Sequence, residues 1–277
     1  MRICFICFFS SPTLAMSRTY QIHVDTTSQT AFTTNVYSNT STLYVETVYK
    51  TNNNPFQCTI VLGQPIRRLK NFSLKCAEIP ISFYNIRAPY NTLTLNVASV
   101  LTTYTVPPGN YTSGTLLSSL NGLVTSGIGQ FATNPATNRV TFTSAVGSLV
   151  IIPVTQRSLA YFLGFTNAQS VTGVGNLVTA TNSYMINFDT YVNVFIENLR
   201  ASSMQPMVPV TFKVPITVAN GAIENYFENT RFSQCIETYD PNFRIDRLNI
   251  IVYDRYGNII DNNGVDWSFT LEMEADT

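Results

Sequence analysis

Several residue types on which enzymes depend are scarce in this chain. It contains one histidine, His23, and one tryptophan, and charged residues make up only 12% of the sequence, where about a quarter is usual. A Ser-His-Asp or Cys-His site would have to recruit that single histidine. The sequence also lacks the motifs of nucleophile elbows, phosphate-binding loops, zinc proteases and dinucleotide-binding folds. We therefore expect a protein that is not an enzyme, with no catalytic residues, no cofactor-binding residues and no cofactor.

Two groups of acidic residues still need an interpretation. Glu197 and Glu237 lie on strand-like segments and are candidates for the carboxylate pair of a glycoside hydrolase, although the sequence gives no separation between them. The segment Asp261–Asp266, DNNGVD, superficially resembles a calcium loop, but its glycine is fourth rather than sixth. Asparagine and glycine tolerate positive φ, so we interpret this segment as a turn and expect no metal site.

The cysteines do not form a zinc-ribbon pattern, because Cys4 and Cys7 lack a second pair. Cys58, Cys76 and Cys235 lie in apolar, strand-like contexts. The simplest interpretation is that these three are free, buried thiols in a reducing compartment.

The charge balance gives no reason to expect a specific nucleic-acid partner. Lys plus Arg and Asp plus Glu both total 16, so no net field favours nucleic acid or an anionic membrane. A local basic cluster, Arg67, Arg68, Lys70 and Lys75, could face nucleic acid, but such a run is more often a solvated strand face. Elsewhere polarity comes from Asn, Thr and Ser, which desolvate more cheaply than charges and suit burial against other protein.

The N-terminal region is predicted to lie outside the main domain. Residues 1–15 read as an upstream extension or a signal-like segment, because Arg2 and the apolar run Ile3–Phe9 precede the sequence SSPTLA. The apolar run is too short to span a bilayer. Met16 then resembles a natural start, with Met1 as the alternative. Residues 16–42 are polar and irregular, and we predict an extended N-terminal arm that orders against another surface.

Residues 43–277 are predicted to form an all-β domain, a single jelly roll built as a two-sheet antiparallel sandwich. About ten strand-like runs, rich in β-branched and aromatic residues, recur between turn residues, and long helices are absent. In the last run Trp267, Phe269, Leu271 and Met273 alternate with polar residues, which predicts a buried stripe. The predicted strands are Leu43–Lys50, Phe56–Leu62, Phe72–Ala77, Leu93–Val100, Tyr184–Phe188, Val192–Asn198, Val208–Val218, Phe232–Thr238, Ile245–Tyr253 and Trp267–Met273.

A small helix-containing α/β insertion is predicted near residues 105–182. Four leucines form one apolar stripe of a short helix between Ser113 and Gly127, and residues 158–165 form a second short helix. Arg139–Thr143 and Leu149–Val154 are predicted to pair as a hairpin, and residues 166–182 to form a loop. The four leucines are Leu116, Leu117, Leu120 and Leu123.

Four segments, taken in order, carry a family resemblance. They are EIPISFYNI (Glu78–Ile86), TVPPGNYTSGTLLSSLN (Thr105–Asn121), LAYFLGF (Leu159–Phe165) and the ending DRLNIIVYDRYGNIIDNNGVDWSFTLEME (Asp246–Glu274). Their order and spacing resemble the single-jelly-roll penton, or vertex capsid, proteins of nucleocytoplasmic large DNA viruses, virophages and Polinton-like elements. The resemblance covers roughly residues 56–274.

The resemblance implies a structural capsid protein of the virion, assembled inside the host cell. Five copies would form the pentameric vertex of an icosahedral double-stranded DNA virus. The implied partners are further copies of the chain, major capsid protein trimers and minor capsid proteins, with no small-molecule substrate. The alternatives are a minor capsid protein, a carbohydrate- or receptor-binding jelly-roll module, and a jelly-roll hydrolase.

Overall fold

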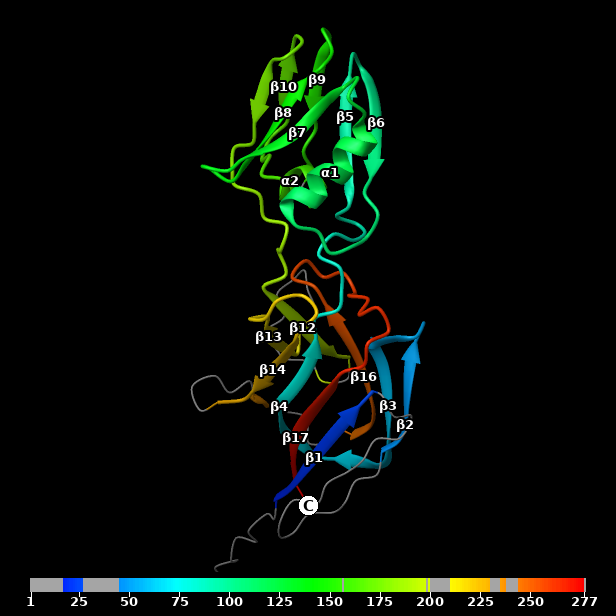
Figure 1. Cartoon of the computed structure of the whole chain (residues 1–277). Coiled ribbons are helices and arrows are strands. Elements are labelled where there is room, and N and C mark those ends of the chain that lie inside the picture. Colours follow the sequence, from blue (N-terminus) through cyan, green and yellow to red (C-terminus); the bar gives the residue numbers. More distant parts are fainter. Residues whose placement is uncertain are drawn as a thin grey trace, which may run out of the picture. The chain divides into compact units, whose positions relative to one another are not determined.

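The computed structural model divides the chain into two compact units, drawn in Figure 1. Unit 1 consists of residues 1–82 and 191–277, and unit 2 consists of residues 83–190. Strands dominate both units, and among the described residues no helix is long and apolar enough to cross a membrane. The structure describes residues 17–26, 45–155, 157–197, 199, 210–229, 235–237 and 244–276.

Unit 1 is a sandwich of two antiparallel sheets, which is the predicted class of fold. Its strands are β1 (Ser17–Asp25), β2 (Val45–Thr51), β3 (Asn54–Arg67), β4 (Leu69–Pro80), β12 (Tyr191–Ile196), β13 (Phe212–Pro215), β14 (Ile223–Phe227), β15 (Cys235–Glu237), β16 (Arg244–Tyr253) and β17 (Ser268–Asp276). One sheet has the order β1-β17-β4-β14, with β15 also paired to β4, and the other has the order β13-β12-β16-β3-β2. Edge-to-face contact between Phe72 of β4 and Phe212 of β13, with centroids 5.8 Å apart, joins their inner faces.

The closing strand confirms the predicted buried stripe. Phe269, Leu271 and Met273 of β17 are at most 2% exposed, and half-exposed residues alternate with them, because successive side chains of a strand point to opposite faces. Trp267, just before β17, is 2% exposed. Its indole Nε1 donates to the Pro55 carbonyl oxygen at 2.8 Å, which satisfies the polar group of an otherwise apolar side chain.

Part of the predicted N-terminal arm is instead a strand of unit 1. β1 pairs with β17 along its whole length, and Ile22 and Val24 are fully buried. The reason is an alternation of apolar with polar residues, with Gln21 and His23 on the opposite face, that is short enough to look irregular in a Thr-rich context. The remainder of the predicted arm and the predicted upstream segment at residues 1–15 lie outside the described residues.

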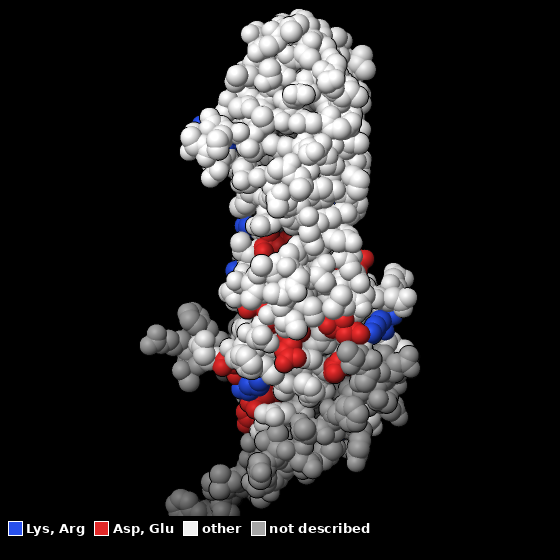
Figure 2. All heavy atoms as spheres, viewed as in Figure 1, with Lys and Arg blue, Asp and Glu red and all other residues white. Residues whose placement is uncertain are grey.

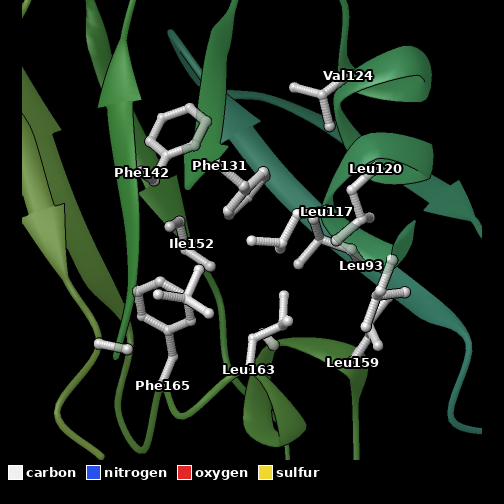
Figure 3. Close-up of a cluster of buried hydrophobic side chains, with 14 of the residues drawn as sticks. Leu93, Leu117, Leu120, Val124, Phe131, Phe142, Ile152, Leu159, Leu163 and Phe165 are labelled. Atoms are coloured by element: carbon white, nitrogen blue, oxygen red, sulfur yellow. The ribbon is translucent and has the colours of Figure 1, made fainter. Parts of the chain in front are cut away.

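Unit 2 has two further antiparallel sheets and two helices around its own core. Its elements are β5 (Thr92–Val97), β6 (Val100–Thr105), α1 (Ser113–Val124), β7 (Gly129–Asn134), β8 (Arg139–Ser144), β9 (Leu149–Ile152), α2 (Leu159–Phe162), β10 (Gln169–Thr172) and β11 (Leu177–Thr179). The sheet orders are β10-β9-β5-β6 and β11-β8-β7. Figure 3 shows the core, in which Leu117 and Leu120 of α1 point toward Leu93, Phe131 and Ile152 of the strands.

Helix α1 confirms the predicted helix with one change to its buried stripe. Thr112 caps its first turn in a reciprocal arrangement with Thr115. Leu116, Leu117 and Leu120 are buried as predicted, but Leu123 is 36% exposed and Val124 takes its place in the core. The apolar face continues four residues after Leu120, because the helical repeat is 3.6 residues. Helix α2 confirms the second short helix.

Other predictions for this region were wrong. The insertion was placed near residues 105–182, but the compact unit begins at Phe83 and ends at Thr190, so β5 and half of the first family segment belong to it. The predicted hairpin does not form, since β8 pairs with β7 and β11 whereas β9 pairs with β10 and β5. Residues 166–182, predicted as a loop, contain β10 and β11. The predicted strand Tyr184–Phe188 is irregular.

Candidate interaction surfaces

Unit 2 has very few charged side chains. Only Arg87, Arg139, Arg157 and Asp189 are charged between Phe83 and Thr190, and unit 2 is white over nearly all of the face shown in Figure 2. Arg87 and Asp189 are also buried against each other, with 10% and 7% of their side chains exposed and 2.7 Å between Nη1 and Oδ2. The surface of unit 2 therefore consists mainly of hydroxyl, amide and apolar groups.

Exposed aliphatic side chains gather where strands of unit 2 begin and end. Backbone bonds and pairings hold these turns together: the Ala98 N–H donates to the Leu149 carbonyl at 3.0 Å, and Leu149 pairs with Thr172. The Asn176 side chain then donates to the Thr172 carbonyl. We call this region the apolar end, defined by Val100, Leu101, Leu149, Val174 and Leu177, which are 44–71% exposed.

The apolar end is suited to contact with protein. No charged residue occurs in its turns at residues 97–101, 144–149 and 172–177. Exposed apolar surface without charged residues is typical of sites that contact other protein. Its large side chains are aliphatic, so they lack the aromatic faces on which sugars and bases stack.

The outward face of the β1-β17-β4-β14 sheet in unit 1 is charged and paired. Lys75 of β4 lies 2.6 Å from a Glu228 oxygen and 3.0 Å from a Glu272 oxygen, and Lys70 lies 2.7 Å from Asp276. Acidic and basic side chains gather over unit 1 in Figure 2. Burial lowers the pKa of Lys75, but its hydrogen bonds to the two glutamates outweigh burial and raise that pKa above its ordinary value.

The structure separates the predicted basic cluster into two parts. Lys70 and Lys75 are occupied by carboxylates of their own sheet. Arg67 and Arg68 are exposed where β3 turns into β4, and Arg68 adopts a positive φ of 53° there. The arrangement resembles an ordinary solvated strand face more than a continuous phosphate-binding surface.

The candidate calcium loop forms a turn, and the two candidate glutamates belong to segments of different sheets. In the segment Asp261–Asp266 the Asp261 carboxylate accepts the Asn263 N–H at 2.9 Å, and Asn263 and Gly264 have positive φ, as the turn interpretation requires. Glu197 follows β12, and Glu237 lies in β15 of the other sheet. Across the described ranges, no group of three or more His, Cys, Asp or Glu residues could hold a metal ion.

His23 and the described cysteines have structural surroundings. His23 Nδ1 lies 3.0 Å from the Thr270 hydroxyl on the neighbouring strand. Cys58 and Cys76 are free thiols, the first buried and the second half-buried. Burial raises the pKa of the Cys58 thiol to about 12. Cys4, Cys7 and the side chain of Cys235 lie outside what the structure describes.

The buried Arg87–Asp189 pair was not predicted, although a signal for it exists in the sequence. Asp189 is the only acidic residue between Glu78 and Glu197. An isolated acid in a charge-poor region needs a cation when it is buried, and few arginines are available there. The pair joins the segments with which unit 2 begins and ends, and Asn85 donates to Asn187 at 2.9 Å beside it.

Comparison with solved structures gives a likeness to the mavirus penton protein, known from a crystal structure of the SeMet-labeled protein. The TM-score is 0.46, the sequence identity is 11%, and the likeness covers 83% of this chain and 98% of that chain. No protein-family model matches the sequence, and no curated protein matches it.

Proposed function

We propose that the protein is a structural subunit of an icosahedral viral capsid and forms the fivefold vertex as a homopentamer. The observation that carries the proposal is that the four segments similar to penton proteins contact one another through hydrogen bonds and core packing. Turns and helix ends that resembled penton proteins only by chance would not be expected to contact one another in the fold.

The first and second segments are joined inside unit 2. Ile86 and Gly109 exchange both backbone hydrogen bonds, at 3.1 and 2.9 Å. The Asn85 side chain accepts from the Tyr111 N–H at 2.9 Å and donates to the Tyr111 carbonyl at 2.8 Å. One asparagine thereby satisfies both backbone groups of a residue in the turn before α1.

The remaining segments are joined to these two. In unit 1 the Ser82 hydroxyl of the first segment donates to the Asn262 carbonyl of the ending at 2.8 Å, and Asn263 donates to the Ser82 carbonyl at 2.7 Å. In unit 2 the third segment places Leu159 and Leu163 in the same core as Leu117 of the second. The ordered pattern in the sequence therefore corresponds to a connected pattern of contacts.

The surfaces of the two units are compatible with assembly. A ring of identical subunits reuses one head-to-tail interface, so groups of like charge would recur around the ring. The charge-poor surface of unit 2 avoids that repetition, and its hydroxyl and amide groups can be buried cheaply.

Native mass spectrometry of the purified full-length chain tests the oligomer, and cryo-electron microscopy of particles tests the location. We expect a pentamer, and density at the vertices with a copy number of five per vertex. Density between major capsid trimers away from the vertices would replace this role with that of a minor capsid protein. A monomer that binds defined glycans on an array would instead indicate a carbohydrate-binding module.

A further inference from the structure

Among the described residues, strand β6 presents an open backbone edge. It is the last strand in the order β10-β9-β5-β6 and pairs with β5 at all six residues without a shift in register. The turn between the two strands, Ala98–Ser99, has positive φ at both residues, as in the tight two-residue hairpins that fix register.

The register determines which backbone groups of β6 point outward. Val97 and Val100 flank the turn as a hydrogen-bonded pair, so hydrogen-bonded and non-bonded pairs alternate from there. Thr94 and Thr103 form a non-bonded pair, in which side chains come closer, and their hydroxyls are 3.0 Å apart. The N–H and C=O groups of alternate residues are therefore directed away from β5. These residues are Leu101, Thr103 and Thr105.

Side chains on both faces of β6 are also exposed. Val100 and Leu101, which point to opposite faces, are each 65% exposed. Thr102, Thr103 and Thr105 are exposed as well. The exception on β6 is Tyr104, which is half-buried against the core of unit 2. Among the described residues, an added strand would therefore lie beside mostly exposed side chains.

The other long uncharged edge in unit 2 is protected. β7 has the same length as β6 and no charged residue. Its central residue, Phe131, donates its N–H to the Asn121 side chain at 2.7 Å, and its carbonyl accepts from the same amide at 2.8 Å. A side chain of α1 thus takes the bonds that an added strand would need.

The remaining described edges carry features that discourage strand addition. β10, β11 and β15 are only three or four residues long. β1 and β2 contain charged residues, and β2 is also bulged. β13 contains Lys213 and Pro215, and β14 contains the inward-pointing Glu224, which is 6% exposed. β6 has none of these features.

We propose that β6 is a docking edge to which an extended, uncharged segment of another polypeptide adds as a further strand. Backbone hydrogen bonds would hold the segment, as in other cases of strand addition. Val100 and Leu101 would offer it aliphatic contacts at the apolar end. A charged segment would leave its charges without partners, because β6 and the neighbouring turns have none.

A second copy of the chain is the competing occupant. Two β6 edges would meet antiparallel about a two-fold axis and close a dimer, and the fivefold ring proposed above contains no such axis. The choice of a different polypeptide therefore rests on the proposed function, whereas the open edge itself does not.

Amide hydrogen exchange of the full-length chain, measured by NMR with and without a strand peptide, tests the docking edge. The probe is a synthetic peptide with the sequence of residues 99–106, SVLTTYTV, which is uncharged and prone to extend. We expect added protection at Leu101, Thr103 and Thr105, and no change at the intervening residues, which already bond to β5. A peptide N-methylated at alternate residues should bind about tenfold more weakly or worse, because it loses backbone donors.

Two variants and one control complete the test. Thr103→Pro removes an outward N–H and should weaken peptide binding by about tenfold or more; Leu101→Lys, which keeps the backbone, should do the same by charging the edge. Val174→Asn removes apolar area from the apolar end and should leave the alternating protection intact.

Equal binding of the methylated peptide, or protection that does not alternate, would overturn the docking edge. Dimerisation of the full-length chain that Leu101→Lys abolishes would overturn the choice of partner, since the occupant would be a second copy. Failure to form a pentamer, measured separately, bears on the proposed function and leaves the edge standing.

Discussion

The charged residues of the chain are divided unevenly between its two units. All but four lie in unit 1, together with the five cysteines, the histidine and the tryptophan. The outward sheet face of unit 1 is lined by ion pairs such as Lys75 with Glu228 and Glu272. Unit 2 buries half of its own charged residues in one pair, Arg87 with Asp189, and exposes aliphatic side chains at its apolar end.

This difference indicates that the two units are adapted to different surroundings. Charged, paired residues keep a sheet face hydrated and discourage strand addition. A surface of hydroxyls, amides and exposed aliphatics loses little when it is covered by another protein. In the assembly proposed above we therefore expect unit 2 to carry more of the contacts with other protein, whereas charges on the outward sheet face of unit 1 pair with one another.

The largest expected effect concerns the thiols, which report on unit 1 alone. Because burial raises the Cys58 pKa from 9.0 to about 12, its thiolate fraction at pH 8 should be about a thousandfold below that of an unperturbed thiol. Mass spectrometry of iodoacetamide-treated native protein should show slow labelling at Cys58 and faster labelling at the half-buried Cys76. Equal rates at both would show that unit 1 opens readily.

The same shift has a defined sign for stability. The folded state holds the Cys58 proton more tightly than the unfolded state, so this contribution is complete below pH 9.0 and is lost as the pH rises toward about 12. Cys58→Ala should remove that part of the alkaline loss of stability in denaturation experiments.

Truncation of a side chain in the buried stripe that ends in β17 should destabilise unit 1 selectively. Trp267→Ala removes a side chain that is 2% exposed and lies edge-to-face with Phe56 at 5.6 Å, and should cost roughly 3–5 kcal/mol. Cys58 labelling should accelerate while amide exchange in unit 2 stays unchanged. Trp267→Phe, which keeps a ring but loses the bond to Pro55, should cost less. A Trp267→Ala protein of undiminished stability that loses glycan binding would contradict the core role.

Removal of the buried guanidinium of Arg87 should destabilise unit 2 selectively. Arg87→Met keeps an apolar stem but leaves the Asp189 carboxylate buried without this cation, at a cost of about 3 kcal/mol. Amide exchange in unit 2 should accelerate, while the Trp267 fluorescence of unit 1 is unaffected. Combining Arg87→Met with Asp189→Leu should recover most of the loss. If the double variant is no more stable than the single one, the pair is not what holds this region.

The smallest expected effect is a difference between the two units in how their stability depends on salt. The Lys75 side chain is 34% exposed, so solvent screens its pairs, and Lys75→Met should cost about 1 kcal/mol or less. The difference from the unmodified chain should vanish in about 1 M salt. Unit 2, with few charged groups, should show little salt dependence under the same conditions. A strong dependence in unit 2 would contradict the contrast drawn above.

The elements that the sequence predicts well are those with a local signal. Alternation at Trp267, Phe269, Leu271 and Met273 places the closing strand, and the leucine stripe before Val124 places α1. Both patterns follow from the geometry of a single element. The turn at Asp261–Asp266 is likewise set by residues that tolerate positive φ.

The elements that the sequence predicts poorly depend on distant partners. β8 and β9 look like a hairpin because they are close in sequence, but β9 is fixed by β5, some fifty residues earlier. β1 was hidden in a polar region, although Ile22 and Val24 become core once β17 is beside them. The open edge of β6 could not be predicted, because exposure of an edge is a property of the whole sheet order.

The hydrogen bond that links Asn85 to Asn187, and the ion pair beside it, affect how the sandwich of unit 1 forms. They bring the entry and exit of unit 2 together within that unit. For β4 and β12, on either side of it in the sequence, a folded unit 2 is then equivalent to a short loop rather than to a hundred flexible residues. Since the entropy of closing a loop grows with its flexible length, unit 2 should fold before the sheets of unit 1 are complete and bring their strands within reach of each other.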